Sequence, residues 1–158
     1  MLGEGRVLVG VAGGFGAVLR GPGHVHHGGM ELIRLGEPEG PATARVHDIA
    51  AVWTGAGFRV RAYDDVEQLV WEKLVCNTCY SGTATLTGHT IGGIIGDPAA
   101  FAVALACAEE TAATARARGV ALTFDDVEAY VRAFGERIAG ERPSMLLDLL
   151  ARRPGEID

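Results

Sequence analysis

The sequence lacks the features that mark membrane, nucleic-acid-binding and disulfide-rich secreted proteins. No apolar run reaches the length of a membrane span, and the N-terminus lacks the basic-then-apolar order of a signal peptide. The net charge is −6, so the chain has no basic excess for a nucleic-acid or anionic membrane surface. The 3 cysteines are odd in number, which argues against a disulfide framework. We therefore expect a reduced, cytoplasmic protein with no nucleic-acid and no membrane partner.

The remaining composition is that of a globular protein. A chain of 158 residues, with 48% hydrophobic and 22% charged residues, fits one ordinary domain or parts of two. Such a chain can bury roughly 68–70% of its unfolded surface, so neither a disulfide nor a metal is needed for stability. Most of the 23 glycines lie in the first hundred residues, which predicts a turn-rich first part.

Short strands and turns are predicted for the first 63 residues. Alternating or β-branched segments bounded by glycine predict strands at residues 6–12, 17–20, 24–27, 31–35 and 58–62. A helix from Thr43 to Gly55 stands between the last two strands, with Thr43 as a candidate N-cap.

The rest of the chain predicts helices only. Asp64 and Asp65 can cap a helix that contains residues 69–86. Several glycines then interrupt the helical pattern before further helices, which are predicted at residues 98–118, 124–139 and 144–151. The expected fold class is therefore an α/β fragment at residues 1–63 followed by an all-α domain at residues 64–158.

One glycine-rich segment imitates a dinucleotide-binding loop. Gly10, Gly13, Gly14 and Gly16 follow a predicted strand. A true fingerprint opens a helix and carries an acidic residue about 20 positions later. Here the third glycine position is Leu19, and the segment continues into Gly-Pro-Gly. A turn between strands is therefore favoured over a phosphate loop.

Pairs of histidines and cysteines offer two further candidate motifs. His24 and His26 share one strand face, but no carboxylate or cysteine stands at ligand spacing. We therefore predict no metal site. Cys76 and Cys79 match C-x-x-C, yet they fall inside a predicted helix rather than at a helix N-terminus after a strand. Packing within the helical region is the favoured role for both cysteines.

A polar ladder runs along the helix at residues 69–86, which otherwise looks built for burial. Lys73, Asn77, Ser81 and Thr85 are spaced four residues apart, so they project from nearly one face. A lysine followed by small hydrogen-bonding residues is unusual for a core. From the helix alone, a solvated stripe of an amphipathic helix and a binding site are equally open interpretations.

The C-terminal segment supplies a second set of polar residues. Ser144 and Asp148 are four residues apart on a predicted short helix, and Glu156 follows a proline–glycine turn. Taken alone, this pattern indicates an N-cap serine, a surface aspartate and a tail glutamate.

Three segments match one family pattern in order and spacing over essentially the whole chain. They are GVAGGFGAVLRGPGHVHHGG, WEKLVCNTCYSGTATLTG and PSMLLDLLARRPGEID. Together they resemble the ketopantoate reductases (2-dehydropantoate 2-reductases). The corresponding family patterns are roughly G-x-x-x-x-x-G-A-x-x-x-x-P-G-x-V-x-H, W-x-K-L-x-x-N-x-x-x-N-x-x-x-A-L and S-M-x-x-D-x-x-x-x-R-x-T-E-I-D.

The resemblance implies both a reaction and a fold. The reaction is the NADPH-dependent reduction of the ketone of 2-dehydropantoate to the alcohol of (R)-pantoate, a step toward coenzyme A. The fold is the C-terminal half of a Rossmann domain followed by a helical domain like that of 6-phosphogluconate dehydrogenase. The substrate, a small 2-oxo acid, is expected in the cleft between a complete Rossmann domain and the helical domain.

The resemblance also implies roles for single residues. Lys73 stands where the family has its catalytic lysine, which can stabilise the oxyanion left by hydride transfer and donate a proton. Glu156 matches the acid that orders the substrate hydroxyl and the lysine near the nicotinamide, so it is both a catalytic and a cofactor-binding candidate. Asn77, Ser81 and Ser144 match substrate-binding positions.

The chain departs from the family pattern at three positions near these residues. Ser81 replaces a second asparagine, Ile91 stands where an asparagine is common, and Gly155 replaces a threonine. Shorter or apolar side chains remove polar contacts to the substrate. A reductase of another 2-oxo acid is therefore an alternative to the first interpretation.

The cofactor side of the family is only partly represented. Ala17 falls where the family backbone passes near the nicotinamide. The first half of the Rossmann domain, with its GxGxxG loop, and the final helices of the helical domain are absent from these 158 residues. We therefore expect the chain alone to be inactive and to bind NADPH weakly or not at all. A truncated, non-catalytic module that forms a homodimer is the remaining alternative.

Overall fold

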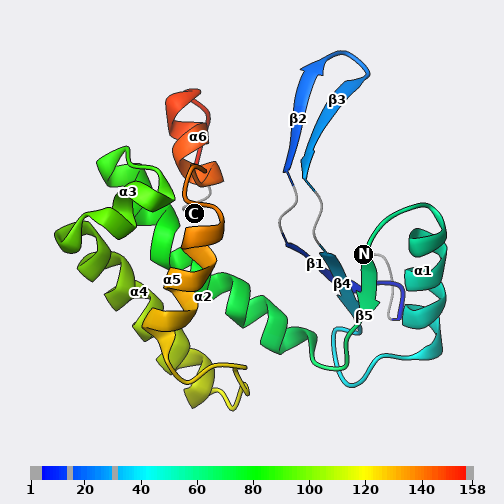
Figure 1. Ribbon diagram of the computed structural model, residues 1–158. Coiled ribbons are helices and arrows are strands. Elements are labelled where there is room, and N and C mark those ends of the chain that lie inside the picture. The colour runs from blue at the N-terminus through cyan, green and yellow to red at the C-terminus, as the bar shows by residue number, and fades with distance from the viewer. Residues whose placement is uncertain (1–4, 14–15, 30–31, 156–158) are drawn as a thin grey trace. The chain divides into compact units, whose positions relative to one another are not determined.

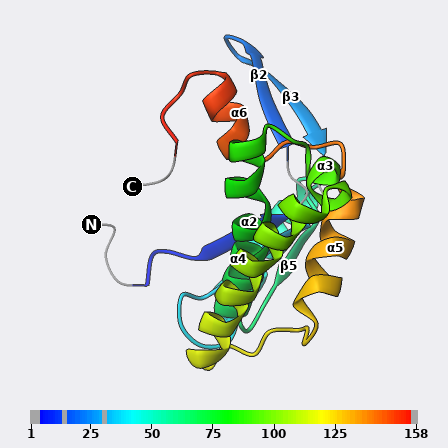
Figure 2. The ribbon, with the colours of Figure 1, turned by 90° about the vertical axis from the view of Figure 1, so that its left-hand side faces the viewer.

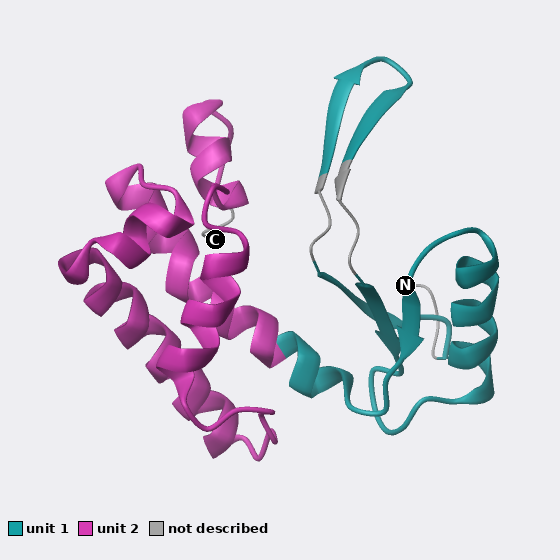
Figure 3. Ribbon diagram, in the orientation of Figure 1, with its two compact units in different colours: residues 1–70 teal, residues 71–158 magenta. Residues whose placement is uncertain are grey.

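The computed structural model of the chain describes residues 5–13, 16–29 and 32–155. The chain divides into two compact units, residues 1–70 and 71–158 (Figure 3). Every described strand precedes α2, and only helices follow it, which confirms the predicted α/β portion followed by a helical portion. In chain order the elements are β1 (Val9–Gly13), β2 (Gly16–Gly21), β3 (His24–Gly29), β4 (Leu32–Gly36), α1 (Ala44–Gly55), β5 (Val60–Ala62), α2 (Val66–Thr87), α3 (Ile91–Gly96), α4 (Pro98–Ala117), α5 (Val127–Arg137) and α6 (Ser144–Leu150).

Unit 1 is built on a sheet with the strand order β1-β4-β5 (Figure 1). β1 and β4 are antiparallel, whereas β4 and β5 are parallel. A parallel pair needs a crossover connection, and α1 supplies it. Val46 of α1 is buried against Ile33 and Leu35 of β4. β2 and β3 form a separate antiparallel hairpin, and Gly23 between them has a φ of 72°.

A buried carboxylate links the end of β4 to the start of α1. Glu37 is 7% exposed and accepts hydrogen bonds from the Thr43 hydroxyl and the Arg45 guanidinium. The hydrogen bonds from Arg45 and then Thr43 lower the pKa of Glu37 to about 2. Thr43 occupies the N-cap position of α1, but its side chain does not cap the helix. Its hydroxyl donates to Glu37 instead.

α2 begins where its capping residues predict. The Gln68 backbone N–H donates to Asp65 Oδ1 over 2.9 Å. Val66 and Leu69, both in the first turns of the helix, are buried and belong to unit 1. A Cβ atom at Gly36 would overlap the Val66 side chain. The close approach of β4 to the start of α2 therefore requires glycine at this position.

The core of unit 2 involves α2, α4 and α5, which run alongside one another (Figure 1 and Figure 2). α4 contributes Ala104, Ala108 and Ala112, which have no exposed surface, so these small side chains allow close helix packing. Tyr80 of α2 is 2% exposed, and its hydroxyl donates to the Val131 carbonyl over 2.7 Å. This buried hydrogen bond ties α2 to α5.

The glycine interruption predicted after α2 is wrong, because part of that segment forms α3. Thr90 caps this helix by accepting a hydrogen bond from the Gly93 N–H over 3.1 Å. Ile91 and Ile94 are buried in the core of unit 2. Their burial outweighs the low helix propensity of the glycines around them.

The later helices begin close to their predicted positions. Asp97 caps α4 by accepting a hydrogen bond from the Ala99 N–H over 2.9 Å. Asp126 caps α5 in the same way, so α5 begins at Val127 and not at the predicted Phe124. Within the described residues, no helix has the length and apolar character needed to span a membrane.

Candidate active site

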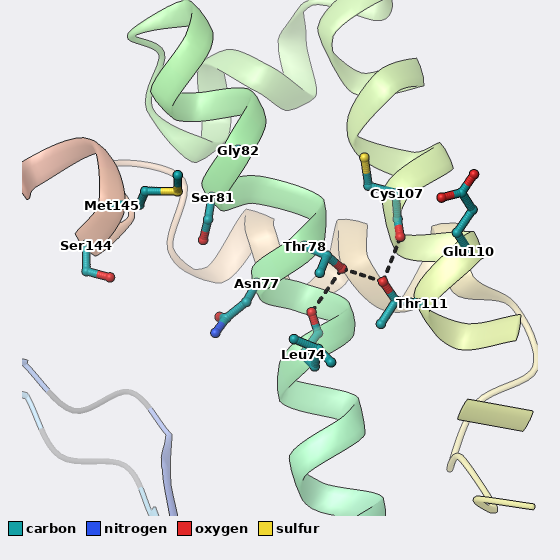
Figure 4. A pocket seen from close by; sticks show the side chains of 10 residues that line it. All are labelled: Leu74, Asn77, Thr78, Ser81, Gly82, Cys107, Glu110, Thr111, Ser144 and Met145. Carbon is teal, nitrogen blue, oxygen red and sulfur yellow. Dashed lines mark hydrogen bonds between the residues drawn. The ribbon is translucent and has the colours of Figure 1, made fainter. Parts of the chain in front are cut away.

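The three predicted substrate-binding residues lie around one pocket of unit 2. Asn77 and Ser81 project from α2 on the side where α6 carries Ser144 and Met145 (Figure 4). This pocket, the larger pocket, has a volume of about 600 Å³. It is lined by Leu74, Asn77, Thr78, Ser81, Gly82, Cys107, Glu110, Thr111, Ser144 and Met145.

The same three residues also line a second pocket of unit 2. This smaller pocket has a volume of about 180 Å³. Its other lining residues come from α2, α3, α5 and the loop before α6. They are Cys76, Tyr80, Ile91, Phe134, Ile138, Glu141, Arg142 and Pro143. Asn77, Ser81 and Ser144, called the polar trio below, therefore line both the larger and the smaller pocket.

A hydrogen bond between two threonine hydroxyl groups connects α2 to α4 at the larger pocket. The Thr78 and Thr111 hydroxyl oxygens are 2.9 Å apart, and Thr111 donates to the Cys107 carbonyl over 2.8 Å (Figure 4). Glu110 adds a carboxylate to this pocket. Of the lining residues that α4 contributes, Glu110 is the only charged one, and its charge is negative.

Lys73 lies one helical turn before Asn77 on α2 and is exposed. It lines neither pocket. Of the 14 lysine and arginine residues in the chain, it is the only lysine. At the other end of the polar ladder, the Thr85 hydroxyl donates to the Ser81 carbonyl over 2.7 Å. The Thr85 hydroxyl thus has its hydrogen-bond partner within α2.

The expectation that the rest of α2 is built for burial is wrong for two leucines. Leu74 is 40% exposed and Leu86 is 86% exposed. The buried face of α2 is instead formed by smaller or aromatic residues such as Val75, Cys79 and Tyr80. Leu74 lies at the larger pocket.

Two other predicted site residues are not placed relative to the polar trio. Glu156 lies outside the described residues. Ala17 is an exposed residue of β2, in unit 1.

α6 is closed by a pair of residues that belong to the C-terminal family pattern. Arg153 Nε donates to Asp148 Oδ1 over 2.8 Å, and the Arg153 N–H donates to the Asp148 carbonyl over 2.8 Å. Between them, Arg152 adopts a left-handed φ of 55°. This arrangement is a helix C-terminal cap. Asp148 is therefore a structural partner at the helix end and not simply a surface carboxylate.

The loop before α6 is attached to α3 by backbone hydrogen bonds. The Ile91 N–H donates to the Glu141 carbonyl over 3.0 Å, and the Gly92 N–H donates to the Ala139 carbonyl over 2.8 Å. A Cβ atom at Gly92 would lie 2.9 Å from the Ala139 carbonyl oxygen. Glycine thus allows the close approach that positions the loop leading to Ser144.

Cys76 and Cys79 are both buried free thiols. Burial raises the pKa of each thiol to about 12. Both therefore stay protonated near neutral pH, as expected for cysteines that pack in a core. In the part of the chain that the structure describes, no group of three or more His, Cys, Asp or Glu side chains could hold a metal ion.

Sequence reasoning missed several residues that line the pockets. Met145 belongs to the quoted C-terminal segment, and Arg142 directly precedes that segment, so the motif itself was a usable signal for both. Cys107 and Glu110 come from α4, and no sequence pattern links them to the polar trio. Only the packing of α4 beside α2 brings them to the larger pocket.

Comparisons with known proteins agree on one family. Residues 65–158 match the family described as Ketopantoate reductase PanE/ApbA C terminal. A 2-dehydropantoate 2-reductase of Archaeoglobus fulgidus is 30% identical over 153 residues, which cover 97% of this chain and 51% of the relative. One of Mesorhizobium japonicum is 31% identical over 137 residues, which cover 87% of this chain and 41% of the relative.

A solved structure extends the similarity to the fold. The crystal structure of a 2-dehydropantoate 2-reductase from Geobacter metallireducens matches with a TM-score of 0.86 at 32% identity, covering 98% of this chain and 52% of that chain. The chain spans about half the length of the relatives it matches. The motif pattern, the family match and the fold agree, and the chain belongs to the ketopantoate reductase family.

Proposed function

We propose that this chain is the substrate-binding half of an NADPH-dependent 2-dehydropantoate 2-reductase, which produces (R)-pantoate on the route to coenzyme A. The supporting observation is that the polar trio lines both pockets of unit 2, with Asn77 one turn along α2 from Lys73. In this proposal, residues 1–63 are the end of a nucleotide-binding domain. Residues 64–158 are then most of a helical substrate-binding domain.

Lys73 is the proposed catalytic residue. When a hydride reaches C2 of a 2-oxo acid, the C=O bond becomes a C–O⁻ group, and this oxygen needs positive charge and a proton. The Lys73 ammonium supplies both, because it donates a hydrogen bond to the oxyanion and then transfers the proton, leaving a neutral amine. An arginine could supply the charge but would keep its proton. The presence of a single lysine at this position, in a chain that otherwise uses arginine, supports the proposal.

The polar trio is proposed to hold the substrate. The Asn77 amide and the Ser81 and Ser144 hydroxyls can donate hydrogen bonds to carboxylate or carbonyl oxygens. Ser81 reaches less far than an amide side chain would. Glu156 is proposed to order the substrate hydroxyl and Lys73.

The cofactor site is proposed to be incomplete in this chain. NADPH supplies the hydride when bound. The glycine run between β1 and β2 leads into a strand and not into a helix N-terminus, so the described residues do not fit the pyrophosphate of a dinucleotide. Ala17 stays a proposed contact to the nicotinamide. We expect negligible NADPH binding by the 158-residue chain in titration calorimetry, and micromolar affinity would contradict this part of the proposal.

A chimera tests the proposed activity. In the Geobacter metallireducens reductase, the matched half is replaced by this chain, and NADPH oxidation with 2-dehydropantoate is followed at 340 nm. Lys73→Ala should lower kcat by roughly 10²–10⁴-fold, because a positioned proton donor contributes about that much. Lys73→Arg keeps the charge but should also lose turnover. Unchanged turnover in Lys73→Ala would refute the catalytic role, and an inactive parent chimera would favour a non-catalytic module.

A second candidate function is the reduction of another 2-oxo acid. Ile91 is 4% exposed and lines the smaller pocket beside the polar trio, so the pocket has an apolar wall at this point. This wall favours a substrate with an apolar side chain over one with a hydroxyl group. The same chimera, tested with a panel of branched and hydroxylated 2-oxo acids, separates the two candidates by their kcat/KM values.

A further inference from the structure

We propose that Arg142 holds the carboxylate of the substrate at the smaller pocket of unit 2. This inference rests on the proposed function and adds to it a substrate-binding residue outside the family pattern given above. A guanidinium is planar and can donate two parallel hydrogen bonds to one carboxylate, which gives both charge and orientation.

The charges of the two pockets differ in a way that favours the smaller one. Among the residues that line the larger pocket, Glu110 carries the only formal charge at neutral pH, and it is negative. Among the residues that line the smaller pocket, Arg142 is the only cation. A 2-oxo acid brings one negative charge to the polar trio, so its carboxylate is attracted toward Arg142 and away from Glu110.

The guanidinium of Arg142 is available for a ligand. Within the described part of the chain it makes no hydrogen bond and no ion pair, and the residue is exposed. Other arginines have their charge met by protein carboxylates: Arg45 pairs with Glu37, and Arg153 pairs with Asp148. Arg142 therefore need not break an existing ion pair to bind an anion.

The backbone that carries Arg142 is held in place. The residue before it, Glu141, donates its N–H to the Ile138 carbonyl over 2.9 Å and accepts from the Ile91 N–H over 3.0 Å. The residue after it is Pro143, which restricts Arg142 to extended backbone conformations. The side chain thus starts from a fixed point at the pocket, two residues before Ser144.

The other residues of the smaller pocket suit a small 2-oxo acid. Tyr80, Ile91, Phe134 and Ile138 give it apolar walls, and the polar trio adds a few hydrogen-bonding groups. Such a mixture is typical of small-molecule sites. Glu141 also lines this pocket, and its carboxylate opposes the binding of an anion. Removal of this negative charge should strengthen the binding of an acid and leave a neutral analogue unaffected.

The test uses the 158-residue chain and two matched probes, 3-methyl-2-oxobutanoate and its neutral amide, 3-methyl-2-oxobutanamide. Binding is measured by NMR titration of the ¹⁵N-labelled chain, including the arginine Nε–Hε signals. Arg142→Gln should lower the affinity for the acid by about tenfold and leave the affinity for the amide unchanged. A tenfold loss is at the lower end of the range for a charge-assisted hydrogen bond, as expected at an exposed residue. Arg142→Lys should lose less affinity for the acid than Arg142→Gln does. Glu141→Gln should raise the affinity for the acid two- to threefold (~0.5 kcal/mol).

Arg59→Gln is the matched control, because it removes one exposed arginine from unit 1. It should not change either affinity. Equal affinity of the parent chain and Arg142→Gln for the acid overturns the role of Arg142 and leaves the proposed function standing. An equal loss in Arg59→Gln also overturns it, because the effect would then be one of net charge. If the parent chain binds neither probe, both the role of Arg142 and the substrate pocket are refuted. Amide-region spectra of each variant confirm that it is folded.

Discussion

The contact between α3 and the loop before α6 makes a quantitative prediction about Gly92. In Gly92→Ala, the new Cβ would lie 2.9 Å from both the Ala139 Cβ and the Ala139 carbonyl oxygen. Backbone must move to relieve this contact, and such overpacking costs about 1–3 kcal/mol. The Gly92–Ala139 hydrogen bond of 2.8 Å would weaken as well, at a cost of about 1 kcal/mol. Against this, alanine gains about 1 kcal/mol of helix propensity. The expected net destabilisation is about 2 kcal/mol.

Gly96→Ala is the matched control for this prediction. Gly96 ends the same short helix, and an added Cβ there would meet no atom within 4 Å. This variant should be neutral or slightly more stable, by up to about 1 kcal/mol. The assay is urea unfolding followed by far-ultraviolet circular dichroism. If the two variants have the same free energy of unfolding, α3 does not restrain the loop as we argue. In that case the fixed placement of Arg142 also loses its support.

Three further predictions concern other parts of the chain. Arg152→Gly should stabilise the protein by about 1 kcal/mol in thermal unfolding, because glycine adopts the left-handed φ of 55° without strain; a lower Tm would show that the arginine side chain matters more. The pKa of Glu37 lies at about 2 in the folded protein, below its ordinary value of 4.5, so its stabilisation is fully present above the ordinary value and is lost as the pH falls toward 2. Glu37→Gln should flatten this acid dependence, and an unchanged pH profile would contradict the assignment. Iodoacetamide at neutral pH should modify the exposed Cys107 and spare Cys76 and Cys79, which are buried with thiol pKa values of about 12; peptide mass spectrometry would expose an error through early labelling of either buried thiol.

For helix α2, the sequence predicted the start of the helix and its polar face but not which apolar residues are buried. The cap at Asp65 and the four-residue spacing of Asn77 and Ser81 could be read directly, because helix faces follow from a fixed period. The same period did not reveal that Leu74 and Leu86 are exposed. Burial depends on which neighbours pack against a face, and those neighbours come from distant parts of the sequence.

Helix α3 shows the opposite case, in which local signals misled. Glycine-rich segments have low helix propensity, so an interruption was the natural prediction. Burial of Ile91 and Ile94 against the other helices of unit 2 overrides that local preference. The three isoleucines of this short segment do not by themselves predict a helix, because they suit a buried strand equally well.

By itself the sequence determined the order of strands and helices, the family, and the polar residues at motif positions. These depend on caps, periodicity and motif spacing, which are local properties of the chain. Only the tertiary structure decided that Asn77, Ser81 and Ser144 border two pockets, that Lys73 lines neither, and that Arg142 supplies the cation of the smaller one. The physical reason is that each pocket is enclosed by segments far apart in sequence. These segments are brought together by the packing of α2, α3, α4, α5 and α6 and by hydrogen bonds that join distant residues.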